Sequence, residues 1–422
     1  MTQTPKIISR REMLKRSAAF SALASASLAW PHWMPRLSFA QGSLRGDVLV
    51  CIFLRGGIDG LNVIVPHGEN AYYAARPRIA VARPDDNKAD KDKRTLDLDG
   101  FFGLNPLLGP LHSIFKNGHL VAVHATGSPD PTRSHFDAMS YMERGTPGSY
   151  SLNSGWVGRH LASFNTENDS ALRAVGWGTA LQQSLRGYVS AVSLKSIVDY
   201  HLGGREDAAA EMLAALNTLY AASPEALQTA ATQTEAVLNM VSKINVADYK
   251  SENGAKYNPQ NDYALALMQT AALIKADVGM EVSAIDLGGW DTHQNQLNDH
   301  NRDLPALADG LAAFYADLGE RMNRVTVVIM SEFGRRVEEN ASAGTDHGHG
   351  NMMMVMGGNV AKKPVIAQWP GLQLEQLDRG DLKITIDYRD VLSEILSVRL
   401  QNPNLGAVFP GYQAVLRGIV TA

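Results

Sequence analysis

The sequence predicts an α/β protein built on a mostly parallel β-sheet covered by helices. Strands that are buried on both faces appear as continuous apolar runs, and such runs recur along this chain. The expected strands are Asp47–Leu54, His119–Ala125, Glu281–Leu287, Arg324–Met330 and Met352–Met356. Stretches with helical periodicity lie between or after them, for example Leu304–Met322 and Tyr388–Leu400. This alternation is typical of a parallel sheet packed between helices.

Composition supports a globular protein and excludes one class of partner. The 422 residues are 45% hydrophobic and 19% charged, enough to bury a large core. Length alone allows one large α/β domain or two, and we predict a single domain over residues 41–422. Residues 1–40 carry six of the basic groups and one acid, so the remainder has a net charge near −9. A chain this acidic is not expected to bind nucleic acid.

The first 40 residues have the three regions of a signal peptide. Ser9–Lys15 (SRREMLK) resembles the twin-arginine export signal, with Met13 where Phe is common. An uncharged stretch, Ser17–Trp30, follows, and small residues suggest cleavage before Gln41. The alternative is a short amphipathic helix. The apolar run is too short for a firm membrane span, so we expect a periplasmic or secreted protein with no integral span in its mature chain.

Two segments interrupt the alternation of strands and helices. Residues 83–99 are highly charged and are expected to form a solvated surface loop. Residues from about 203 to 275 are rich in Ala, Leu, Gln and Glu with helical periodicity, which predicts a helical insertion that caps the sheet. The single cysteine, Cys51, lies within a predicted strand, so we expect a small core residue and no internal disulfide.

Polar clusters follow several predicted strands, where ligands bind in parallel sheets. Asp291 and His293 come after Glu281–Leu287 and its glycine turn. Two residues apart on an extended backbone, they project to the same side and together can hold one cation. The alternative is a buried structural hydrogen bond between them.

A glycine-rich segment with two histidines precedes the strand Met352–Met356. His347 and His349 alternate with glycines in Gly344–Gly350, and glycines allow a ligand to approach the backbone closely. With nitrogen and oxygen donors and no cysteine nearby, a divalent ion such as zinc or manganese suits this segment. The alternative is an ordinary surface loop.

Two further groups sit at predicted strand ends. Glu332 follows Arg324–Met330 and can ligate a metal or act as a base, while Arg335 can hold an oxyanion. A simple ion pair between them is the alternative. Ser134, flanked by Arg133 and His135 at a predicted helix start, is a candidate nucleophile. A helix cap and nothing more is the alternative for Ser134.

Together these segments resemble the DUF1501 family of exported proteins, along nearly the whole mature chain. The resemblance rests on Leu54–Asn62, Arg133–Phe136, Gly289–His293, Ser331–Arg335, the Asp346–Gly350 loop and Asp387–Asp390. The family is regarded as a distant relative of the alkaline phosphatase and sulfatase superfamily. The resemblance therefore implies a three-layer α/β/α sandwich of that type.

The resemblance also implies roles for individual residues. Asp59 matches the first acidic metal ligand, Ser134 the nucleophile, and Asp291 with His293 a later ligand pair at a shorter spacing than usual. Glu332 stands where the aspartate of an Asp-His-Gly motif is expected, and His347 or His349 where the last histidine is. Phe333 occupies that motif's histidine position and cannot bind a metal. Such a site holds one metal, recruits His135, or has lost hydrolysis.

We therefore expect an exported, metal-dependent hydrolase of phosphate or sulfate esters on a small molecule or glycan. In this hypothesis Ser134 attacks and Arg133 or Arg335 supports the developing charge. The alternative is a non-catalytic relative that binds a glycan or another exported protein at the cell surface. A redox protein is disfavoured because the sequence contains no haem, flavin or copper motif.

Overall fold

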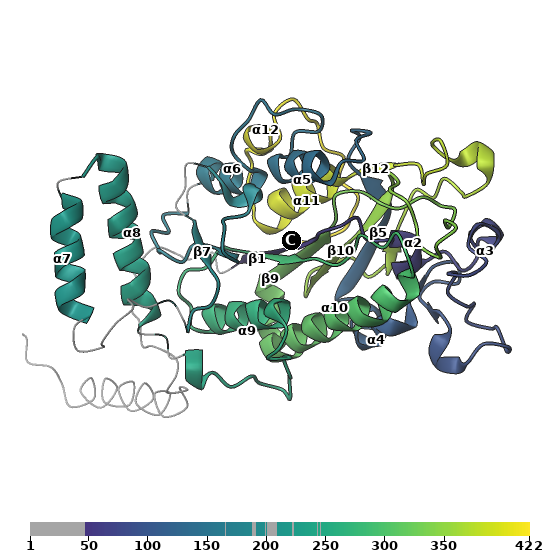
Figure 1. The fold of residues 1–422 in the computed structure, drawn as a ribbon, viewed down its shortest axis with the longest axis horizontal. Helices are drawn as coiled ribbons and strands as arrows, with labels where there is room; N and C mark the ends of the chain where they lie inside the picture. Colours follow the sequence, from purple (N-terminus) through teal and green to yellow (C-terminus); the bar gives the residue numbers. More distant parts are fainter. Residues whose placement is uncertain are drawn as a thin grey trace, which may run out of the picture.

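The computed structural model describes residues 47–422 apart from residues 165, 188–190, 199, 201–208, 222, 243 and 245. The predicted signal peptide lies outside the described residues. The described chain forms a central nine-stranded sheet between two layers of helices, as Figure 1 shows. The strand order is β11-β5-β10-β9-β1-β8-β6-β7, and β12 pairs with β5. The predicted α/β class with a mostly parallel sheet is confirmed.

The five predicted strands all form, within a few residues of their expected ends. They are β1 (Val48–Leu54), β5 (Leu120–Gly127), β8 (Val282–Leu287), β9 (Val325–Met330) and β10 (Asn351–Gly357). Four short strands complete the sheet, namely β6 (Ala174–Trp177), β7 (Val192–Leu194), β11 (Val365–Ile366) and β12 (Ile386–Asp387). Runs of two to four residues carry too little periodicity to be recognised from sequence.

One strand reverses the direction of the sheet. All neighbouring pairs are parallel except those of β10, which runs antiparallel to both β5 and β9. The start of β10 therefore lies at the same edge as the carboxyl ends of its neighbours. The glycine-rich segment before β10 consequently joins the loops that follow β5, β8 and β9.

Alternate residues of β1 enter two separate cores. Val48, Val50, Ile52 and Leu54 pack with α4 (Gly109–Lys116), α9 (Asp262–Lys275) and α10 (Gln296–Leu318). Leu49, Cys51 and Phe53 pack on the opposite face with α6 (Trp156–Ser163), α11 (Tyr388–Glu394), α12 (Leu405–Val408) and Met142 of α5 (His135–Arg144). Figure 1 shows these two helical layers on either side of the sheet. Cys51 is buried and unpaired, in agreement with a core role.

The remaining elements lie outside this sandwich. A small antiparallel sheet contains β2 (Ile64–Val65), β3 (Leu96–Asp97) and β4 (Gly103–Leu104), near α2 (Gly60–Val63) and α3 (Asn70–Ala75). In the predicted insertion, α7 (Ala209–Ala221) and α8 (Glu225–Val241) form a pair at one end of the molecule, whereas α9 packs against the sheet (Figure 1). Among the described residues, no helix combines the length and apolar character needed to cross a membrane.

Candidate functional site

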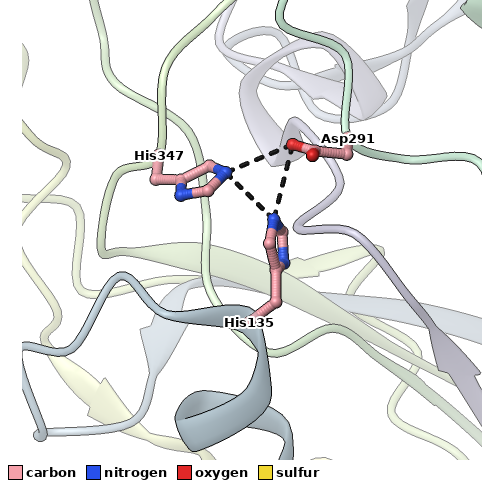
Figure 2. A group of neighbouring side chains, drawn as sticks. All are labelled: His135, Asp291 and His347. Carbon is pink, nitrogen blue, oxygen red and sulfur yellow. Dashed lines mark hydrogen bonds and ion pairs between the residues drawn. The ribbon is translucent and has the colours of Figure 1, made fainter.

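Donor atoms from three segments of the chain gather around Nε2 of His347 at the edge of the sheet where β10 begins. The Nε2 atom of His347 lies 2.9 Å from Nε2 of His135, 2.9 Å from Nε2 of His293 and 3.2 Å from Oδ1 of Asp291. The same Asp291 oxygen is 3.1 Å from His293 and 3.4 Å from His135. Figure 2 shows His135, Asp291 and His347 pointing toward one another. We call these four residues the metal cluster.

The hydrogen bonds behind the three imidazoles fix their orientation. Each Nδ1 faces an oxygen that can only accept, so in a neutral ring Nδ1 carries the proton and Nε2 a lone pair. These oxygens are Oε1 of Glu332 for His135 at 2.7 Å, Oδ1 of Asp346 for His293 at 3.2 Å, and the Arg133 carbonyl for His347 at 2.9 Å. Three lone pairs and a carboxylate oxygen that face one another repel unless a cation lies between them. Oxygen acceptors behind ligating histidines are also typical of metal sites.

The spacing of the donor atoms suits a small divalent ion. Ligands about 2.0–2.1 Å from a tetrahedral centre are separated by about 3.3 Å from one another. The distances from Nε2 of His347 and from Oδ1 of Asp291 to the other donor atoms run from 2.9 to 3.4 Å, and the donor atoms of His135, Asp291 and His347 all lie within 4.8 Å of one another. The side chains of His135 and His347 are 21% and 22% exposed and that of Asp291 is 50% exposed. The metal cluster is therefore open to solvent.

The buried side chain of Arg335 holds the carboxylate of Asp291 in place. Its guanidinium is completely buried and donates to Oδ1 of Asp291 at 2.8 Å. It also donates to main-chain carbonyls, which belong to Gly56, Gly57, Trp290 and Thr345. Partial burial alone would raise the pKa of Asp291, but the hydrogen bond from Arg335 and its positive charge help to lower that pKa to about 2. Arg335, predicted as an oxyanion clamp, thus contacts a metal-cluster residue and not the open side of the site.

Glu332 is hydrogen-bonded to His135 of the metal cluster. Its side chain is buried and accepts from the Gly56 N–H at 2.8 Å and from Oγ of Ser331 at 2.9 Å, as well as from His135. The hydrogen bond from His135 to this carboxylate raises the pKa of His135. Glu332, predicted as a metal ligand, instead fixes the orientation of His135 through this hydrogen bond.

Two other residues predicted as metal ligands lie away from the metal cluster. Asp59 is buried and forms an ion pair with Arg76, and it also accepts from Gln296. His349 directs Nε2 to the Ser128 carbonyl at 2.9 Å and Nδ1 to Asp378 at 3.3 Å. Of the six predicted ligands, Asp291, His293 and His347 come together.

The predicted nucleophile lies next to the metal cluster in the chain. Ser134 caps the N-terminus of α5, and its Oγ accepts from the Asp137 N–H at 3.4 Å. His135, the following residue, is the fourth member of the metal cluster, which the sequence indicated only as a substitute for Phe333. Arg133 forms an ion pair with buried Asp381 and keeps 38% of its side chain exposed.

Phe333 fills the position where the resemblance implies a histidine. Its ring is buried, and its centroid lies 4.8 Å from that of His135 and 4.9 Å from that of His347. Phe333 therefore packs against two rings of the metal cluster, and His135 supplies a nitrogen donor within it.

The fold and this site define an α/β sandwich protein with an imidazole and carboxylate cluster that can hold a metal ion. The chain belongs to the family described as "Protein of unknown function (DUF1501)", which matches residues 47–397. The family expected from the sequence is confirmed. No curated protein sequence matches the chain significantly.

Solved structures with similar chain traces have low sequence identity to this chain and low TM-scores. The lipoteichoic acid synthase LtaP from Listeria monocytogenes is 10% identical with a TM-score of 0.34, covering 84% of this chain and 76% of its own. The C-terminal periplasmic domain of EcEptC from Escherichia coli, a complex with Zn, is 7% identical with a TM-score of 0.32, covering 77% and 76%. The PH0037 protein from Pyrococcus horikoshii is 12% identical with a TM-score of 0.29, covering 83% and 96%.

Proposed function

We propose that this protein is an exported, metal-dependent hydrolase of phosphate or sulfate esters. The observation that carries the proposal is that the donor atoms of His135, Asp291 and His347 lie close enough together to hold one metal ion, with His293 beside His347 and Asp291. Three imidazoles and one carboxylate favour zinc over the harder manganese ion. A bound divalent ion at this point would polarise the ester and stabilise its negative charge.

The residues around the metal cluster support chemistry at Ser134. Its Oγ would form a bond to phosphorus or sulfur while the bond from that atom to the ester oxygen breaks. The serine proton ends on the departing alcohol, and water then cleaves the seryl ester and restores Ser134. The positive end of the α5 helix dipole and the partly exposed Arg133 lie beside Ser134 in the chain and favour an anionic group there.

A cleft lined by His349 and by the loop before Ser134 offers room for the rest of a substrate. Its volume is about 940 Å³, and Pro129 of the loop that leads to Ser134 forms part of its wall. Its lining also contains Trp369, Lys383 and Asp378. An aromatic ring among charged groups suits a small polar ester or a glycan ester.

A second candidate function is a metal-containing binding protein without hydrolytic activity. Phe333 favours it, because an apolar ring occupies the side of the metal cluster where the resemblance implies another ligand. Such a protein would bind a glycan or another exported protein.

One experiment distinguishes the two candidate functions. Protein purified after export is analysed for bound metal and then assayed with chromogenic phosphate monoesters, phosphate diesters and sulfate esters. Hydrolysis that disappears with a chelator and returns with zinc or manganese supports the hydrolase. Bound metal without turnover of any ester favours the binding protein, and absence of metal affinity contradicts both.

A further inference from the structure

A buried glutamine joins three loops directly behind the metal cluster. Gln296 is the first residue of α10, and its side chain is fully buried. Its Nε2 donates to Oδ2 of Asp59 at 2.6 Å. Its Oε1 accepts from Oγ1 of Thr292 at 2.9 Å and from Oγ1 of Thr345 at 2.7 Å. All three partners are themselves buried.

Only one orientation of the Gln296 amide satisfies these contacts. Asp59 is held as a carboxylate by Arg76, which donates to both of its oxygens. A carboxylate can only accept, so the amide nitrogen must face Asp59 and the amide oxygen must face the two threonines. Both hydroxyls then donate to the same oxygen. A side chain without both a donor and an acceptor at this position cannot replace Gln296.

The two threonines belong to the loops that carry the metal cluster. Thr292 lies between Asp291 and His293, and Thr345 lies two residues before His347. The Thr345 N–H donates to the Thr292 carbonyl at 3.1 Å, so the two loops are also joined by their main chains. Gln296 thus fixes both loops relative to each other and to Asp59 beyond β1.

We propose that Gln296 is a positioning residue of the metal centre. It contacts no donor atom of the metal cluster, but it fixes the loops so that Asp291, His293 and His347 meet before an ion binds. A preformed site binds more tightly because less loop motion is lost on binding. The inference rests on the proposed metal-dependent function, because it assumes that the metal cluster binds an ion.

The test compares Gln296→Met with Gln269→Met in the full mature chain. Methionine keeps the approximate length of glutamine but removes the donor and the acceptor. Gln269 is a matched control because it is also buried and also uses both ends of its amide, accepting from the Ile197 N–H and donating to the Leu265 carbonyl. It lies in α9, outside the metal-bearing loops.

Three quantities are measured: zinc affinity by competition with a chelator, the visible absorption spectrum of the cobalt form, and urea stability of the metal-free protein. We expect Gln296→Met to weaken zinc binding by about tenfold or more, the range seen when groups behind metal ligands are removed. Its cobalt spectrum should shift as well. Gln269→Met should lower stability without changing zinc affinity or the spectrum.

Substitutions of Thr292 and Thr345 remove the same hydrogen bonds from the other side. They keep the proposal testable if Gln296→Met does not fold. Thr292→Val and Thr345→Val together should weaken zinc binding, and adding Gln296→Met should then weaken it much less than it does alone. Zinc affinity and cobalt spectra equal to wild type in all these variants would overturn the role of Gln296 while leaving the proposed function intact. A wild-type protein that binds neither zinc nor cobalt would overturn both.

Discussion

His135 and His347 lie 212 residues apart in the chain, yet their Nε2 atoms are 2.9 Å apart. His135 begins the helix after β5, whereas His347 precedes β10. They meet because β10 runs antiparallel to β5 and returns the chain to the same edge of the sheet. This contact makes His347 the centre of the metal cluster.

Replacement of His347 by alanine should therefore remove most metal binding. Its Nε2 is within 3.2 Å of the donor atoms of His135, His293 and Asp291. We expect zinc affinity to fall by more than the roughly 10 to 100-fold typical of lost outer partners. His112→Ala in α4, a histidine outside the metal cluster, should bind zinc as the wild type does. Equal affinities of the two variants, measured by chelator competition, would contradict the assignment.

Arg335→Met should be strongly destabilising. The change removes the donor from buried main-chain carbonyls such as those of Gly57 and Thr345, and a buried acceptor left unsatisfied costs about 1–3 kcal/mol. Arg335→Lys should recover only part of this loss, since one ammonium cannot replace the guanidinium fork. Arg302→Met on the surface of α10 should cost less than about 1 kcal/mol. Urea unfolding measures all three, and similar losses for Arg335→Met and Arg302→Met would refute the prediction.

Ser134→Ala separates a nucleophile from a helix cap. If Ser134 attacks the ester, the variant should keep its metal, lose about 1 kcal/mol of stability and lose turnover. Asn261→Ala is the matched cap control, because Asn261 caps α9 by accepting from the Tyr263 and Ala264 N–H groups. It should lose similar stability and keep full activity. A folded, metal-containing Ser134→Ala protein with wild-type turnover removes Ser134 from the mechanism.

The buried pair of Asp59 and Arg76 should make stability depend on acid pH. Burial alone would raise the pKa of Asp59, but Arg76 outweighs this and holds that pKa below its usual 3.8. The lowered pKa contributes stability that is present above pH 3.8 and lost as the pH falls through the folded-state pKa. Asp59→Asn should be less stable at neutral pH and should lose less stability between about pH 5 and pH 2. Urea unfolding across this range tests the prediction, and parallel curves for both proteins would oppose it.

Export should depend on the arginine pair of the predicted signal. Replacing Arg10 and Arg11 together by lysine should leave the full-length precursor in the cytoplasm, because the twin-arginine receptor tolerates little change at this pair. Arg36→Lys, equally conservative but near the expected cleavage site, should be exported and processed. Cell fractionation with immunoblotting measures both, and normal processing of the double variant would show that another route is used.

Local sequence patterns were sufficient for the main strands and for most loops of the site. A buried strand such as β9 is a continuous apolar run, and the polar residues after it, Ser331–Arg335, mark the end of the strand. The alternation of His347 and His349 with glycines likewise indicated a functional segment. These features depend on neighbours in the chain, so they can be recognised without knowledge of the fold.

The sequence by itself determined the α/β class, the family and the loops that carry the site. Only the tertiary structure decided that His135 joins the metal cluster, that Glu332 and Arg335 stand behind it, and that Asp59 pairs with Arg76. The antiparallel direction of β10 was also decided only by the tertiary structure. Which polar side chains meet depends on strand direction and on pairing between distant segments. His347 and His349 therefore have similar glycine-rich neighbours in the sequence but different contacts in the structure. His347 faces the other donor atoms of the metal cluster, whereas His349 faces the Ser128 carbonyl.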